Sequence, residues 1–114
     1  MKIAIPLLKE RVAPHFGSSS EILLVEIHSG SVYQEAKWDV GSQSPLDMAR
    51  RLVDLGIEKI ICGGINRFEK EWLIEKEVSV EDNRKGEAKE IVEKLLVGID
   101  TVPPATSKPT KEEV

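Results

Sequence analysis

The sequence predicts an α/β fold in which helices flank a mixed five-stranded sheet, in the order β-β-β-α-β-α-β-α. The first forty residues hold short β-branched and apolar runs joined by a turn, which favours a hairpin-linked start. The remainder alternates amphipathic helical stretches with short apolar runs, which is typical of strand–helix units. The chain has 114 residues, of which 40% are hydrophobic and 32% charged, so we expect one globular domain over residues 1–100.

Three strands are expected first. Lys2 to Leu7 is β-branched and apolar, and Glu21 to Ile27 is apolar on both faces at its centre. The tight turn at Ser29-Gly30 predicts a hairpin between this second strand and a third over Ser31 to Trp38. The third strand alternates in polarity, so one of its faces should be wetter than the other.

Strand–helix units follow. Ser44 as N-cap with Pro45 at the first helical position predicts a helix that Gly56 can end. A short strand over Ile57 to Cys62 comes next, and a helix over Arg67 to Glu75 follows it. Asn66 can cap this second helix.

The end of the chain divides into a strand, a helix and a tail. The alternating stretch "EVSVE" predicts a short strand. The following "DNRKGEAKEIVEKLLVGID" predicts the clearest helix, because its apolar residues recur with helical spacing and Gly98 is placed to stop it. Residues 101–114 are rich in proline and almost devoid of apolar side chains, so we expect a disordered tail.

Composition excludes several classes of protein. The net charge is −4 with acidic and basic residues interspersed, so no basic stripe for nucleic acid is present. No apolar run has the length needed to cross a bilayer, and the first residues make a poor secretory signal. One cysteine cannot form an internal disulfide, which favours a cytoplasmic location. No paired-cysteine or Ser-His-Asp motif is found, so we expect no enzymatic activity.

Two loops carry candidate chemistry. His15 lies between Pro14 and the glycine of "PHFG", at the carboxyl end of the first strand, where ligands of such sheets gather. A neutral imidazole held there can bind a metal, although a solvent-exposed or turn-capping histidine is an equal reading. Cys62 precedes Gly63 and Gly64 at the end of another strand, and glycines let a ligand approach the backbone. As a lone cysteine, Cys62 reads better as a buried apolar residue.

The other candidates read as structure. His28 stands at the hairpin turn and is explained by turn polarity. Ser18, Ser19 and Ser20 are more typical of a solvated loop than of an anion site.

The motifs "MKIAIPL", "RVAPHFGSSSEILLVEI" and "CGGI", in this order, resemble the dinitrogenase iron–molybdenum cofactor biosynthesis family, the NifX-like group that includes NafY and the C-terminal part of NifB. The resemblance implies a ribonuclease H-like motif in the sheet. It also implies a small non-catalytic carrier for an iron–sulfur or iron–molybdenum-type cluster or its precursor, which exchanges cargo with a cluster donor or acceptor protein.

Carried over by residue, the resemblance implies that His15 contacts the cluster while Phe16 and Gly17 shape its loop. Gly63 and Gly64 would form the facing loop. A metal would be held by His15 together with Cys62 from the neighbouring strand. We therefore take as the expected site His15, Phe16, Gly17, Cys62, Gly63 and Gly64.

Two other functions stay open on the sequence. After "GGI" the family continues with small residues, whereas this chain has the bulky, charged "NRFEKEW", which favours a protein-interaction module without cofactor. The backbone amides of "PHFGSSS" and "GGIN" also fit a binder of small anions or nucleotides.

Overall fold

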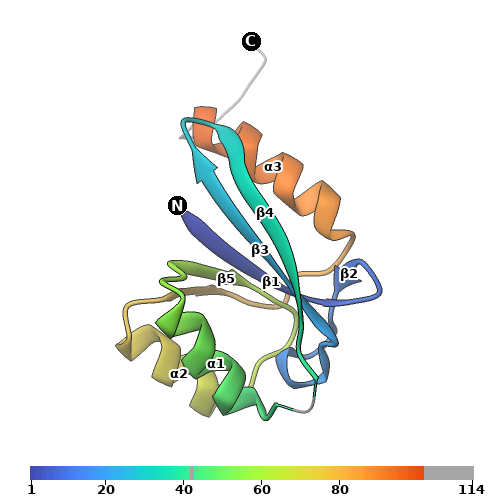
Figure 1. The fold of residues 1–114 in the computed structure, drawn as a ribbon, viewed down its shortest axis with the longest axis vertical. Helices are drawn as coiled ribbons and strands as arrows, with labels where there is room; N and C mark the ends of the chain where they lie inside the picture. Colours follow the sequence, from blue (N-terminus) through green and yellow to red (C-terminus); the bar gives the residue numbers. More distant parts are fainter. Residues whose placement is uncertain (42, 102–114) are drawn as a thin grey trace.

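The computed structural model describes residues 1–41 and 43–101 and shows a mixed sheet with helices on both faces (Figure 1). The elements in chain order are β1 (Lys2–Leu8), β2 (Arg11–Val12), the 3-10 helix η1 (Phe16–Ser18), β3 (Glu21–His28), β4 (Ser31–Asp39), α1 (Pro45–Asp54), β5 (Lys59–Ile61), α2 (Arg67–Glu75), β6 (Ser79–Glu81) and α3 (Ala88–Thr101). None of the helices in these ranges is long and apolar enough to span a membrane.

The sheet has the strand order β4-β3-β1-β5-β6, with β2 paired to β1. β1 is antiparallel to β3, and β3 to β4, whereas β1–β5 and β5–β6 are parallel. The expected mixed sheet and the position of the strand before Cys62 beside the first strand are thus confirmed, although β5 is shorter than expected and ends at Ile61, one residue before Cys62. The arrangement is compatible with a ribonuclease H-like motif.

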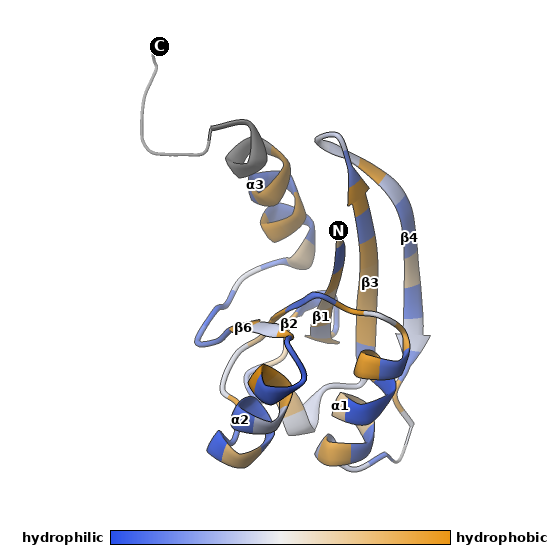
Figure 2. Ribbon diagram, turned by 90° about the vertical axis from the view of Figure 1, so that its left-hand side faces the viewer, coloured by the Kyte–Doolittle hydropathy of each residue, from blue (hydrophilic) through white to orange (hydrophobic). Residues whose placement is uncertain are grey.

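Alternating side chains of the strands divide the core into two layers. Ala4 of β1 and Ile60 of β5 face α1 and α2, where they pack with Leu52 and Leu73. Ile3, Ile5 and Leu7 point to the opposite face, which α3 covers with Ala88, Ile91 and Val92. Figure 2 shows the apolar side of α3 turned toward the strongly apolar β3. Both faces of β1 are therefore buried, as its near-continuous apolar sequence predicts.

Local signals placed the turns and helix starts. Ser29 and Gly30 both have positive φ (53° and 76°), as a two-residue hairpin turn requires. The Ser44 side chain accepts a hydrogen bond from the Asp47 N–H at 3.2 Å and so caps α1. The Asn66 side chain caps α2 by accepting from the Phe68 N–H at 2.7 Å.

The structure corrects three expectations. The sheet has six strands instead of five, because Arg11–Val12 folds back onto the end of β1. The last helix begins at Ala88 rather than near Asp82, since Gly86 adopts a φ of 116° that no helix allows. Gly98 does not end this helix, which runs to Thr101, because one glycine in a helix costs only about 1 kcal/mol. Thr101 thus lies in α3 and not in the expected tail, whose other residues, 102–114, lie outside the described residues.

Candidate functional site

Two loops meet beyond the adjacent strands β1 and β5. We call residues 13–20 the His15 loop and residues 62–66 the glycine loop. His15 and Gly64 form a parallel bridge between them. The Phe16 N–H donates to the Gly64 carbonyl at 2.7 Å, and the Gly64 N–H donates to the Pro14 carbonyl at 2.6 Å. This isolated parallel bridge and its two hydrogen bonds hold the two loops together, beyond the point where β2 has folded back onto β1.

Glycine is required where the loops approach. A Cβ on Gly63 would lie 2.3 Å from the Ala13 carbonyl oxygen and 2.6 Å from that of Pro14, distances that real Cβ atoms do not adopt. A Cβ on Gly64 would lie 2.8 Å from Nδ1 of His15. The two glycines thus permit backbone contact at Gly63 and leave room for the imidazole at Gly64.

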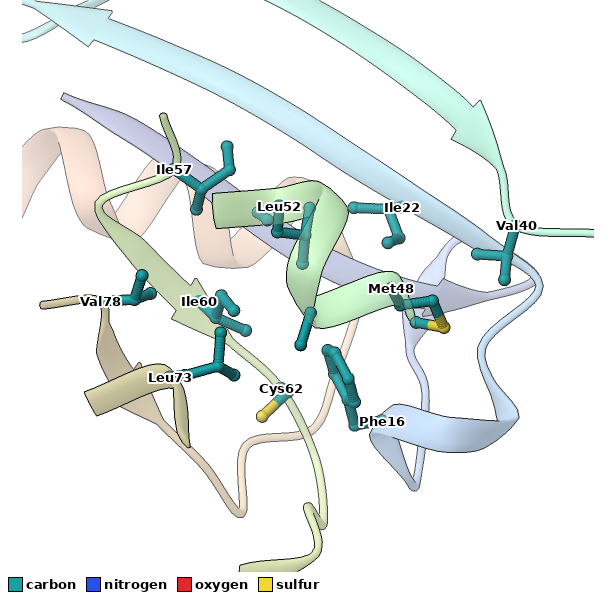
Figure 3. Packing of buried hydrophobic residues seen from close by; sticks show 12 residues of the cluster. Phe16, Ile22, Val40, Met48, Leu52, Ile57, Ile60, Cys62, Leu73 and Val78 are labelled. Carbon is teal, nitrogen blue, oxygen red and sulfur yellow. The ribbon is translucent and has the colours of Figure 1, made fainter. Parts of the chain in front are cut away.

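Phe16 anchors the His15 loop to the core. Its side chain is 1% exposed and packs in the apolar cluster with Met48 and Leu52 (Figure 3). The buried Ser19 hydroxyl donates to the Phe16 carbonyl at 2.9 Å, and Ser18 closes a turn on the His15 carbonyl. These hydroxyls bind carbonyls of the loop itself; Ser18 is exposed, as a solvated loop predicts, whereas Ser19 is buried.

Gly17 fits the loop against the start of α1. A Cβ there would lie 3.0 Å from Cγ of Pro45, so a larger residue would push the loop away from this helix. The His15 loop is therefore braced on one side by the glycine loop and on another by α1.

The His15 imidazole lies outside this braced backbone. The residue is exposed and its backbone is extended, with φ −134° and ψ 141°. Its ring stands against Gly64, close enough that only a residue without Cβ leaves it in place. A fixed backbone with an exposed imidazole can present a nitrogen to a metal or cluster arriving from solvent.

Cys62 is turned away from that surface. Its side chain is 0% exposed and packs in the cluster beneath α1 and α2, where Figure 3 shows it among Phe16, Ile60 and Leu73. Burial raises the pKa of the thiol to about 12, helped by the nearby Asp82 carboxylate and opposed by the Lys70 ammonium. A metal binds the thiolate, which this environment disfavours.

All six expected site residues therefore lie in the paired loops by their backbone, whereas the side chains of Phe16 and Cys62 lie in the core. Within the described residues, no group of three or more His, Cys, Asp or Glu side chains could hold a metal ion. Sequence reasoning missed Asn83, whose N–H donates to the Gly63 carbonyl at 2.9 Å and whose φ is 60°. Its signal is the Asp-Asn pair after a strand, which favours a turn.

Two other candidates are placed as well. His28 is exposed at the hairpin, where Nε2 lies 2.7 Å from a Glu26 carboxylate oxygen and the ring stacks on Tyr33 at 4.5 Å. This histidine has a local structural environment, as the sequence predicts. The anion-binding alternative loses support because the N–H groups of Phe16, Ser18 and Gly64 already donate to carbonyls of the two loops.

Comparisons with known structures agree on the fold. The chain is similar to PH0822 at 24% identity with a TM-score of 0.81, over 86% of this chain and 90% of that one. It is also similar to a proposed dinitrogenase from Methanocaldococcus jannaschii (16% identity, TM-score 0.71, 86% of this chain and 89% of that one). The apo form of the orange protein from Desulfovibrio gigas matches at 20% identity and a TM-score of 0.68, over 85% and 88% of the two chains.

No curated protein matches the sequence. The family described as dinitrogenase iron-molybdenum cofactor matches residues 1–98, which is most of the chain and includes both loops of the candidate site. The chain therefore belongs to the dinitrogenase iron-molybdenum cofactor family.

Proposed function

We propose that this protein is a small non-catalytic carrier of an iron–molybdenum-type or iron–sulfur cluster, or of its precursor, in the cytoplasm. Family membership supports a role in iron–molybdenum cofactor biosynthesis. The observation that carries the finer proposal is the exposed His15 imidazole on a loop fixed to Gly64 by backbone hydrogen bonds of 2.7 and 2.6 Å.

A single imidazole suits transient binding. Neutral imidazole is a good ligand for iron, and one protein ligand leaves the other positions of a cluster open. Cargo held in this way can leave for an acceptor protein without several bonds to the carrier being broken. The hydrogen bonds between the loops keep the backbone at His15 in place, so little backbone freedom is lost when cargo binds.

Cys62 is not part of this proposal as a ligand. To reach a cluster, its thiol would have to leave the core beneath α1 and α2 and lose a proton that burial retains. Both steps oppose binding, so His15 acts without it.

The test is anaerobic uptake by the whole chain of isolated iron–molybdenum cofactor and, separately, of ferrous iron with sulfide. Bound iron, molybdenum and sulfide are measured after gel filtration, with the visible spectrum as a second readout. We expect the wild type and His28→Ala to bind cluster and His15→Ala to lose most of it. His28 is the matched control because it is the other histidine, is also exposed, and lies at the hairpin.

Cys62→Ala separates the two candidate ligands. We expect it to bind as the wild type does, because the thiol lies in the core. Equal and poor uptake by the wild type and His15→Ala would end the carrier proposal. Loss of uptake in Cys62→Ala with an unchanged melting profile would instead assign the thiol to the site.

A protein-interaction module is the second candidate. It is favoured by exposed apolar residues on α2, where Phe68 is 60% and Ile74 52% exposed. This reading predicts no cluster uptake by any variant. It also predicts a protein partner whose binding Phe68→Ala weakens and His15→Ala does not.

A further inference from the structure

The free edge of β4 is the most exposed part of the sheet. β4 pairs only with β3 among the strands of the described ranges. It is nine residues long, and every residue except Trp38 is exposed. Figure 2 shows the largely polar β4 beside the strongly apolar β3. Such an edge carries a row of N–H and C=O groups directed outward, which can pair with another strand.

We propose that this edge pairs in antiparallel orientation with β4 of a second copy of the chain. The two-fold axis then passes between Ala36 of one copy and Ala36 of the other. A two-fold axis perpendicular to the sheet keeps each face continuous across the interface. Residues opposite each other must then have side chains on the same side of the sheet, so their numbers differ by zero or by an even number. One residue of β4 therefore lies directly opposite its own copy, at the axis. Only a few registers satisfy this condition.

Charge selects among these registers. With Ala36 on the axis, Glu35 faces Lys37 of the second copy, and Lys37 faces its Glu35, so that two opposite-charge pairs form. An axis at Glu35 or at Lys37 places like charges opposite each other, which destabilises strand pairing. A lysine on an edge strand normally opposes pairing with another strand, but here the charge of Lys37 is neutralised by Glu35 of the second copy.

Two further registers can be compared. An axis at Gln34 leaves Glu35 opposite Tyr33 and gives no charge pair. An axis at Trp38 pairs Lys37 with Asp39 but leaves only these three positions of β4 within the paired segment, since the strand ends at Asp39. The Ala36 register pairs Gln34 through Trp38, which all lie in the regular part of β4, and is therefore both longer and charge-matched.

The charges involved are available for pairing. Neither Glu35 nor Lys37 takes part in an ion pair within the part of the chain that the structure describes. Both line a groove of about 460 Å³ between the sheet and α3. The irregularity in the β3–β4 pairing lies near the hairpin, between Glu26 and Ile27, so the register opposite Gln34–Asp39 is regular.

The first test is a charge exchange measured by sedimentation velocity over a concentration series at low salt. We expect the wild type to form a dimer, and Glu35→Lys and Lys37→Glu each to weaken it about tenfold or more, because each single change creates two like-charge pairs. The double variant Glu35→Lys/Lys37→Glu should restore it. An equimolar mixture of the two single variants should form a mixed dimer, since one carries only positive and the other only negative charge at these positions.

The second test fixes the register. Ala36→Cys should form an intermolecular disulfide on mild oxidation, because directly opposite residues have Cα atoms about 4.5–5.5 Å apart, within disulfide range. Gln34→Cys is the matched control: it lies on the same face but faces Trp38 of the second copy, so it should not cross-link. The natural Cys62 is buried and does not compete.

Three results would overturn the proposal. One is a wild type that stays monomeric at all concentrations tested, and another is a dimer indifferent to the charge exchange. The third is cross-linking of Ala36→Cys only after residues 102–114 are deleted, which would assign the edge to the chain's own terminal segment. Thermal melts of all variants separate these results from loss of folding.

Discussion

Gly63 lies where the two loops of the site are closest, so Gly63→Ala tests the loop contact directly. The added Cβ would lie 2.3 Å from the Ala13 carbonyl oxygen, and Cβ contacts below 3.0 Å are essentially unknown, so the loops must separate by at least 0.7 Å (3.0 − 2.3). That shift stretches the two hydrogen bonds between the loops, now 2.7 and 2.6 Å, toward the limit of hydrogen bonding.

The magnitude follows from these two bonds. Their loss costs about 2 kcal/mol at about 1 kcal/mol each. The lower entropy of the unfolded alanine chain offsets about 0.5 kcal/mol of it. The net loss of unfolding free energy is therefore about 1.5 kcal/mol, which lowers the melting temperature of a domain of this size by about 6–12 °C.

The assay combines urea unfolding with amide hydrogen exchange. In Gly63→Ala, the amides of Phe16 and Gly64 should exchange faster, because their carbonyl partners move away. Gly41→Ala is the control: it has open space around the new Cβ but a φ of +67°, so it should lose stability without exposing these amides. Unchanged protection of both amides, with unfolding free energy within about 0.5 kcal/mol of the wild type, would refute the role given to Gly63.

Two other predictions concern the core beneath the site. Phe16→Ala should lower the unfolding free energy by about 3–5 kcal/mol in urea titrations, whereas Phe16→Leu should cost less than about 1.5 kcal/mol, because Phe16 is 1% exposed; equal effects of the two would contradict its role as an anchor. Burial raises the pKa of Cys62 from 9.0 to about 12, so the unfolded thiol loses its proton first as the pH rises. Between pH 9 and 12 the wild type should therefore lose stability relative to Cys62→Ala, and parallel pH profiles would show that the thiol is not buried.

Elements defined by local interactions could be predicted from the sequence. The caps Ser44 and Asn66 act within three residues, and the Ser29-Gly30 turn requires backbone conformations that its residues favour. These signals do not depend on distant parts of the chain. They placed α1, α2 and the hairpin to within a residue of the observed boundaries.

Elements defined by tertiary contacts could not be predicted from the sequence. The two residues of β2 form a strand only because they pair with Leu7 and Leu8. The turn that permits this pairing places Lys9 and Glu10 at φ 54° and 64°. Lysine and glutamate rarely adopt this left-handed conformation, so the sequence does not indicate the turn. A two-residue strand carries too little periodicity to be detected.

The meeting of the two candidate loops could be predicted, whereas the site itself stays a prediction. The expected neighbouring positions of β1 and β5 bring the segments that follow them together, and the His15–Gly64 bridge confirms this even though β2 intervenes between β1 and the His15 loop. The direction of Cys62 follows from strand alternation, because Ile60 and Cys62 point to the same face. Which face α1 and α2 cover depends on the whole topology, so the burial of the thiol required the structure.

The carrier and dimer proposals can be separated, because the free edge of β4 lies away from the contact between His15 and Gly64, although Ser20 at the far end of the His15 loop accepts a hydrogen bond from the Val40 N–H just after β4. β3 and β1 stand between β4 and the contact of the His15 loop with the strand end of β5. At about 4.8 Å per strand and seven spacings, two such sites lie about 34 Å apart across the dimer axis, too far to share a cluster. Each copy should therefore take up its own cargo, and Glu35→Lys should lose dimerisation while it keeps the cluster-to-chain ratio of the wild type. A ratio that falls with dimerisation would instead show that the site is completed by the second copy.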